Sequence, residues 1–226
     1  MRHSKPSWWI LTLPCPGPRP ARGSICDNSG VARAKDLETR LEHTEKQLYL
    51  LQQISRYMVR DLPLADVLQK VVSLVVEFMN SDSCLLYLLD GNELVLVASN
   101  AHPAEAVGKV RLKLSEGLTG WVARERRLLT ISREAYRDPR FKLFTDLPED
   151  TFEAFLSAPV IIRGRVVGVI NVQHRDPHFH SGGEMELLTT VGEQLGCLVA
   201  LATADLHAIE AAHVLDLVTP SAGAKR

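Results

Sequence analysis

The stretch Ala154–His174, AFLSAPVIIRGRVVGVINVQH, decides which fold this sequence predicts. Two runs rich in branched apolar residues, 155–162 and 166–173, flank the tight segment Arg163–Arg165. Such runs on either side of a glycine-bearing turn are typical of a β-hairpin. Pro159 has no N–H to donate to a neighbouring strand, so we expect the first run to carry a bulge or a free edge there.

The second strand of this hairpin is predicted to have two different faces, because successive side chains of a strand point to opposite sides. One face holds Val166, Gly168, Ile170 and Val172, and the other holds Val167, Val169, Asn171 and Gln173. The first face is apolar throughout, whereas the second becomes polar towards its end. The pattern predicts a sheet that is covered on one side and lines a mixed environment on the other.

The composition is that of an ordinary soluble globular protein, with 46% hydrophobic and 23% charged residues among 226. A net charge of −1 gives no domain-wide basic excess, which argues against a nucleic-acid partner. No apolar run approaches the roughly 18–20 residues that span a bilayer, so no membrane association is expected. The apolar segment Trp8–Leu13 is shorter than a signal-peptide core and is broken at once by prolines, so we expect a cytoplasmic protein.

The four cysteines form neither a C-x-x-C pair nor a zinc-like spacing; they are Cys15, Cys26, Cys84 and Cys197. Reduced, structural thiols fit this arrangement and the cytoplasm. No Walker loop, H-E-x-x-H or serine-nucleophile motif is present, and we therefore expect no enzyme activity and no evident cofactor.

The two ends of the chain show the clearest change of texture. Residues 1–36 are rich in proline and glycine and are predicted to be a disordered leader. Residues 37–60 are predicted to be a helix with a heptad seam, which includes Leu41, Leu48 and Leu51, and a second stripe formed by Leu50, Ile54 and Tyr57. Two stripes allow the helix to pack on its own domain and on a partner at once; a single amphipathic helix folded against the sheet is the alternative.

Between the two ends the pattern predicts helices, hairpins and one long loop. In chain order we expect a helix over 64–79, a hairpin over 83–99, a short strand over 110–114, a helix over 117–126 with Ser115 as its N-cap, a strand over 128–132, an irregular loop over 133–149 and, after the central hairpin, a helix over about 183–214. That last helix repeats apolar residues at heptad spacing, namely Leu188, Val191, Leu195 and Leu198. Residues 215–226 are expected to be a disordered tail. Strands joined by hairpins favour an α+β fold with a mostly antiparallel sheet.

Four segments make roughly residues 54–205 resemble a GAF domain. They are SCLLYLLDGNELVLVAS (83–99), LSEGLTGWVARERRLLTIS (114–132), DPRF (138–141) and FLSAPVIIRGRVVGVINVQ (155–173). In detail they are most similar to GAF domains of nitrogen-system phosphoenolpyruvate-protein phosphotransferases and of nitrogen-fixation transcription activators. In those proteins an effector domain follows, and no such segment is carried over to this chain.

The resemblance implies a GAF domain over 61–205, preceded by a signalling and dimerisation helix over 37–60. It implies a sheet of about five to six strands with the terminal helices on one face. It also implies a ligand cavity on the other face, covered by the helix over 117–126 and the loop over 133–149. Dimerisation through the terminal helices, as a homodimeric coiled coil, would use Leu41, Leu48, Leu51, Leu188, Val191, Leu195 and Leu198, in agreement with the heptad seams.

Candidate ligand-binding residues combine apolar surface with a few polar tips, as small-molecule pockets do. They are Tyr87, Gly117, Gly120, Trp121, Phe141, Phe144, Phe152 and Asn171. Gly117 and Gly120 would leave backbone N–H groups at the start of a helix accessible to an anionic ligand. Alternatively, they let a helix approach the sheet closely. Each side chain has packing as its alternative role.

Three histidines, His174, His178 and His180, follow the central hairpin. They resemble a metal-ligand set, but they lack helical spacing and a fourth organised ligand, so we expect a solvated loop and no metal site. The resulting hypothesis is a non-catalytic sensory module that binds a small molecule and signals through dimerising helices, with a separate effector protein as a candidate partner. A ligand-free dimerisation scaffold is the first alternative, and a cysteine-based redox enzyme like the GAF-type methionine sulfoxide reductases is the second.

Overall fold

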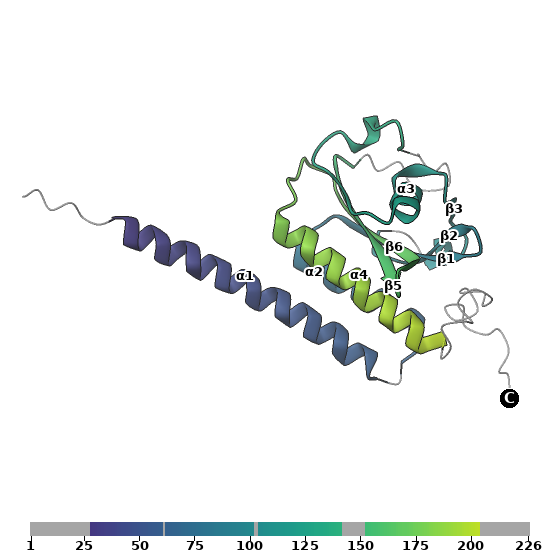
Figure 1. The fold of residues 1–226 in the computed structure, drawn as a ribbon, viewed down its shortest axis with the longest axis horizontal. Coiled ribbons are helices and arrows are strands. Elements are labelled where there is room, and N and C mark those ends of the chain that lie inside the picture. Colours follow the sequence, from purple (N-terminus) through teal and green to yellow (C-terminus); the bar gives the residue numbers. More distant parts are fainter. Residues whose placement is uncertain (1–27, 61, 102–103, 142–151, 204–226) are drawn as a thin grey trace, which may run out of the picture. The chain divides into compact units, whose positions relative to one another are not determined.

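The computed structural model describes residues 28–60, 62–101, 104–141 and 152–203 (Figure 1). The chain divides into two compact units, Met1–Arg40 and Leu41–Arg226. Helix α1, Asn28–Met58, begins earlier than the predicted residue 37. The prediction of a disordered leader is therefore wrong for its last residues, where alanine and lysine favour a helix. The rest of the predicted leader and the predicted tail over 215–226 lie outside the described residues.

Six strands form one sheet in the order β3-β2-β1-β6-β5-β4, and every neighbouring pair is antiparallel. The strands are β1 (Ser83–Asp90), β2 (Glu93–Ser99), β3 (Arg111–Lys113), β4 (Leu129–Ile131), β5 (Ala154–Ile162) and β6 (Arg165–His174). The predicted α+β fold with a mostly antiparallel sheet is confirmed.

The central hairpin is β5–β6, joined by a two-residue turn at Arg163 and Gly164. Both turn residues have positive φ, 47° and 76°, as a type I′ turn requires. The register shifts between Val160 and Ile161, so that Val167 is an extra residue on β6. Because of this bulge the predicted alternation is correct from Gly168 onward but reversed for the two valines before it. Pro159 lies beyond the end of the short neighbour β4, which pairs only with 155–157, so the expected free edge is present.

One face of the sheet is covered by helix α2 (Leu64–Met79) and helix α4 (Gly182–Thr203), which lie side by side (Figure 1). Leu50 and Ile54 of α1 are buried in the same core, as the second stripe of the sequence predicted. Among the described helices, α4 is long and apolar enough to cross a membrane by length and composition. Its inner face is buried against the sheet, which is typical of a core helix of a soluble domain.

The two predicted dimer seams differ in exposure. Leu41 and Leu48 are 59% and 55% exposed, and Leu51 is half-buried. The four seam residues on α4, Leu188, Val191, Leu195 and Leu198, are all buried in this chain's own core. These four side chains are packed within the fold, so of the two predicted seams it is the α1 seam that exposes leucine side chains. The dimer itself stays a prediction.

Candidate functional site

Helix α3 (Gly117–Glu125) lies on the face of the sheet opposite to α2 and α4 (Figure 1). Its N-cap is Glu116 rather than the predicted Ser115. The Glu116 carboxylate accepts a hydrogen bond from the Lys113 N–H at 3.2 Å, closing the turn before the helix. A Cβ at Gly120 would lie 2.8 Å from the carbonyl oxygens of Lys113 and Leu114. Gly120 therefore serves close packing of α3, which is the alternative role noted for it above.

A chain of three buried polar side chains ties α3 to the sheet. The Asn171 amide of β6 donates to the Thr119 hydroxyl of α3 at 2.8 Å. The Ser157 hydroxyl of β5 donates to the Asn171 carbonyl oxygen at 2.6 Å. Around these three polar residues, apolar side chains that include Tyr87, Leu118 and Phe155 form a second core. The space directly between α3 and the sheet is therefore filled by side chains.

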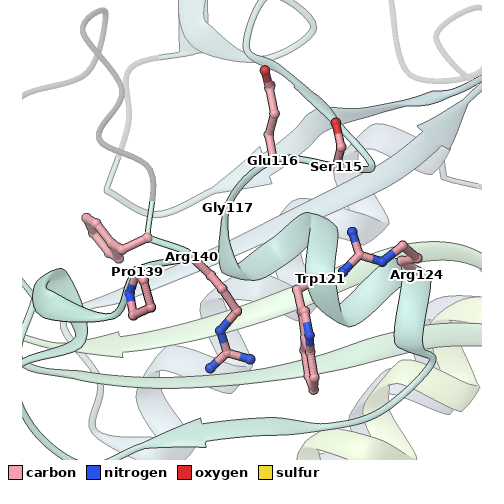
Figure 2. Close-up of a pocket in the computed structure, with 8 residues that line it drawn as sticks. Ser115, Glu116, Gly117, Trp121, Arg124, Pro139 and Arg140 are labelled. Carbon is pink, nitrogen blue, oxygen red and sulfur yellow. The ribbon is translucent and has the colours of Figure 1, made fainter.

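A cavity of about 380 Å³ lies on the outer side of α3, against the segment 139–141 (Figure 2). It is lined by Ser115, Glu116, Gly117, Trp121, Arg124, Pro139, Arg140 and Phe141. In the view of Figure 2, Trp121 lies between Arg140 and Arg124. The Arg140 guanidinium lies over the Trp121 ring, 4.7 Å from its centroid, in a cation–π contact.

Asp138 holds Arg140 in place. Its Oδ1 accepts hydrogen bonds from the Arg140 N–H and Nε at 2.9 Å each, and its Oδ2 accepts one from Nη2 at 2.7 Å. The side-chain hydrogen bonds from Arg140 hold the pKa of the Asp138 carboxyl below its usual value. This paired carboxylate stays ionised at neutral pH and fixes the guanidinium against Trp121, so one wall of the cavity is pre-organised.

The cavity contains three of the eight predicted ligand residues: Gly117, Trp121 and Phe141. Gly120, Tyr87, Phe152 and Asn171 are buried elsewhere in the fold, and Phe144 lies outside the described residues. Sequence reasoning missed Ser115, Glu116, Arg124, Pro139 and Arg140 as lining residues. The D-P-R-F motif at 138–141 was the available signal, since an aspartate two residues before an arginine in a proline turn favours the observed pairing.

Cys84, the cysteine of the redox-enzyme alternative, is fully buried in β1, and burial raises the pKa of its thiol. Since the thiolate is the reactive form, we expect iodoacetamide to leave Cys84 unmodified in the folded chain while the exposed Cys197 reacts. Peptide mass spectrometry after quenching measures both sites. Denatured protein, in which both thiols react, is the control. Modification of native Cys84 at the rate of Cys197 would contradict the burial and favour the redox enzyme.

The predicted solvated loop after β6 is wrong for two of its histidines. His174 and His180 are only 6% and 2% exposed. The loop turns back onto the sheet because the His178 N–H donates to the Ser132 carbonyl oxygen at 3.0 Å. The three imidazole rings consequently meet. The sequence did not predict this contact, because the loop has no helical or strand periodicity.

Comparison with known proteins gives one consistent family. The model of the family described as GAF domain matches residues 61–200. The solved GAF domain of the Acinetobacter phosphoenolpyruvate-protein phosphotransferase is 33% identical, with a TM-score of 0.62 over 70% of this chain and 95% of that one. The Nif-specific regulatory protein of Azospirillum lipoferum is 26% identical over 162 residues, which are 69% of this chain and 26% of that protein. This chain thus spans about a quarter or less of the length of the curated relatives it matches.

A more distant likeness bears on the enzyme alternative. The free methionine-R-sulfoxide reductase of Neisseria meningitidis is 16% identical, with a TM-score of 0.57 over 70% of this chain and 89% of that one. At this identity the likeness concerns the fold alone.

Proposed function

The chain belongs to the GAF domain family, and from this premise we propose that it is a non-catalytic regulatory module that binds a small molecule beside α3 and signals through its terminal helices. The observation that carries the proposal is the cavity against Trp121 and Arg140, with one wall already fixed by Asp138. The regulatory relatives support the role: the matched names are a Nif-specific regulatory protein and a phosphotransferase GAF domain.

The lining favours a small ligand with an anionic group and a flat apolar part. Arg124 and Arg140 are cationic, and their present partners Glu125 and Asp138 leave them able to bond a further anion, since a guanidinium carries five N–H donors. The first N–H groups of a helix have no partner within the helix, and Gly117 places the start of α3 on the cavity. The indole ring of Trp121 supplies a flat apolar surface.

A route for the signal leads from α3 to α4. Thr119 of α3 is bonded to Asn171 of β6, which is bonded to Ser157 of β5. Helix α4 packs directly on β5, where Gly192 and Gly196 lie against backbone carbonyls. A ligand that shifts α3 would therefore displace β5 and β6, the two strands on which α4 packs. The resulting movement of α4 would be the signal that a partner detects.

Dimerisation is the second half of the proposal, with a second copy of this chain docking on α1. The exposed apolar residues of α1 beyond Arg40 are Leu41, Leu48 and Tyr49. Tyr49 also lines a groove between α1 and α2 that includes Leu74 and Phe78. A homodimer through α1 would cover this surface and present both α4 helices to a separate effector protein in the cytoplasm.

Native mass spectrometry of the freshly purified full chain tests both halves. We expect a dimer that carries a small stoichiometric adduct, and we expect Trp121→Ala to lose the adduct because the flat wall of the cavity is removed. Phe179→Ala, which removes an aromatic ring that is 82% exposed and outside the cavity, is the matched control and should keep the adduct. A dimer without adduct, unaffected by a panel of small anions, would instead favour the ligand-free scaffold, which the filled space between α3 and the sheet supports.

A further inference from the structure

Three histidine rings meet where β6 ends and the loop 175–181 leads to α4. The ring centroids of His174 and His178 are 4.1 Å apart, those of His178 and His180 are 4.8 Å apart, and those of His174 and His180 are 5.4 Å apart. One donor nitrogen from each ring lies within 4.8 Å of the other two. The cluster is on no element that lines the cavity beside α3, so it is a second and separate feature.

The outer nitrogens of two of these rings are held by neighbouring elements. His180 Nδ1 is 3.2 Å from the hydroxyl oxygen of Thr130, a β4 residue that pairs with Leu156 of β5. His178 Nε2 is 2.9 Å from Glu184 Oε1 in the first turn of α4. A hydrogen bond on one imidazole nitrogen orients the ring and leaves the other nitrogen as the donor to a metal, which is the usual arrangement around metal-bound histidines.

Two other ring nitrogens of the cluster lack a hydrogen-bond partner. His174 Nε2 and His180 Nε2 are buried, and neither has a hydrogen-bond partner among the residues that the structure describes. Leaving a buried polar atom unpaired destabilises a folded protein.

We propose that His174, His178 and His180 bind a divalent transition metal of the Zn²⁺ type, with a water as the fourth ligand. Imidazole nitrogens suit Zn²⁺, and three histidines with one oxygen ligand make a common tetrahedral set. The metal would give the two unpaired Nε2 atoms a partner. It would also fasten the end of β6, at His174, to the loop, and the contact between His178 and Glu184 links the loop to the first turn of α4.

Metal binding would require a small rearrangement of the three rings. Tetrahedral coordination at about 2.0–2.1 Å places ligand nitrogens roughly 3.4 Å apart, closer than the widest separation in the cluster. The rings of His174 and His178 are nearly parallel, 14° apart, whereas each lone pair lies in its own ring plane. One ring must therefore turn, and we expect it to be His178, which is the most exposed of the three, with a side chain that is 35% exposed and lies in the loop.

The test uses the full chain after treatment with a chelator and dialysis. Calorimetric titration with Zn²⁺ should give one ion per chain, and Co²⁺ should give the intense visible absorption of four-coordinate cobalt. His178→Ala, which removes a half-exposed ring and should fold normally by circular dichroism, is expected to weaken Zn²⁺ binding at least tenfold. His43→Gln, a histidine of α1 that the cluster does not include, is the control and should bind as the parent chain does.

The readouts separate this site from the proposed ligand cavity. Trp121→Ala should leave Zn²⁺ binding unchanged, and His178→Ala should leave the small-molecule adduct unchanged, so either proposal can fail alone. The metal proposal is overturned if the chelated chain takes up no stoichiometric Zn²⁺ at micromolar concentration. It is equally overturned if His178→Ala binds Zn²⁺ as tightly as His43→Gln, or if bound Co²⁺ shows only the weak absorption of six-coordinate cobalt.

Discussion

Replacing Asn171 by aspartate should leave the protein close to parental stability near pH 4 and destabilise it by about 4 kcal/mol at pH 7, on the basis of a pKa raised by several units on burial. Asn171 is 1% exposed and its side chain bonds only hydroxyls, those of Thr119 and Ser157, among the contacts that the structure describes. A protonated carboxyl group can donate to Thr119 and accept from Ser157 as the amide does. An ionised carboxylate loses its donor and carries a buried charge, which burial disfavours.

The direction of the pH dependence follows from proton linkage. Aspartate in the unfolded chain has a pKa of about 3.9, and burial would raise the pKa of Asp at position 171 in the folded chain above this value. At pH values between the two pKa values the folded state therefore binds more protons than the unfolded state. Stability should fall by about 1.4 kcal/mol per pH unit as pH rises from about 4 to the raised pKa, and then become constant. Urea unfolding midpoints between pH 4 and pH 8 measure this. Asn92→Asp, in the exposed β1–β2 turn, is the control and should show no such loss; an equal pH profile for both variants would contradict the burial of Asn171.

The part of the fold that sequence reasoning predicts well depends on local patterns. The β5–β6 hairpin follows from two runs of branched residues and a turn whose glycine takes a positive φ. A bulge or a free edge was expected in the first run at Pro159, but the bulge lies on β6 at Val167. It was not predicted there because it exchanges the faces of Val166 and Val167 without changing the composition of the strand. Propensity and period thus identify the sheet, while the register within it depends on pairing between strands.

The heptad seam of α4 shows a second limit. Apolar residues at steps of three and four form one stripe along a helix, and that stripe packs equally well on a sheet or on another helix. Leu188 and Leu195 lie against the chain's own sheet, whereas Leu41 and Leu48 on α1 remain exposed. The pattern is the same in both helices, and only the tertiary structure distinguishes the core stripe from the available surface.

The candidate sites were predictable where a residue type is unusual and unpredictable where distant segments meet. Trp121 and Phe141 were found from their chemistry, but Arg140 reaches the cavity only because the segment after β4 folds back onto α3. The sequence predicts a solvated loop at the histidines because they lack helical spacing and a fourth organised ligand. The loop instead lies against the sheet, where the His180 ring contacts Thr130 and the His178 backbone N–H donates to Ser132, and both partners are far away in the sequence.

Replacing Gly196 by alanine should destabilise the domain by about 3 kcal/mol, although alanine is the better helix former by about 1 kcal/mol. A Cβ at this position of α4 would lie 2.5 Å from the carbonyl oxygen of Ile161 in β5. Backbone on both sides cannot rotate away, so α4 must lift from the sheet, and forced overpacking of this kind costs about 1–3 kcal/mol or more. Thermal unfolding measures the effect, and a decrease in Tm of about 6–12 °C is expected for a domain of this size.

Gly182→Ala is the matched control, because it adds the same methyl group to the same helix where nothing lies within 4 Å. It should be neutral or slightly stabilising, since only helix propensity changes. The opposite signs of the two variants would show that the loss at Gly196 comes from the contact between α4 and β5. A Gly196→Ala variant as stable as its control would mean that α4 does not lie this close to β5, and the proposed route from α3 to α4 would then lack its last contact.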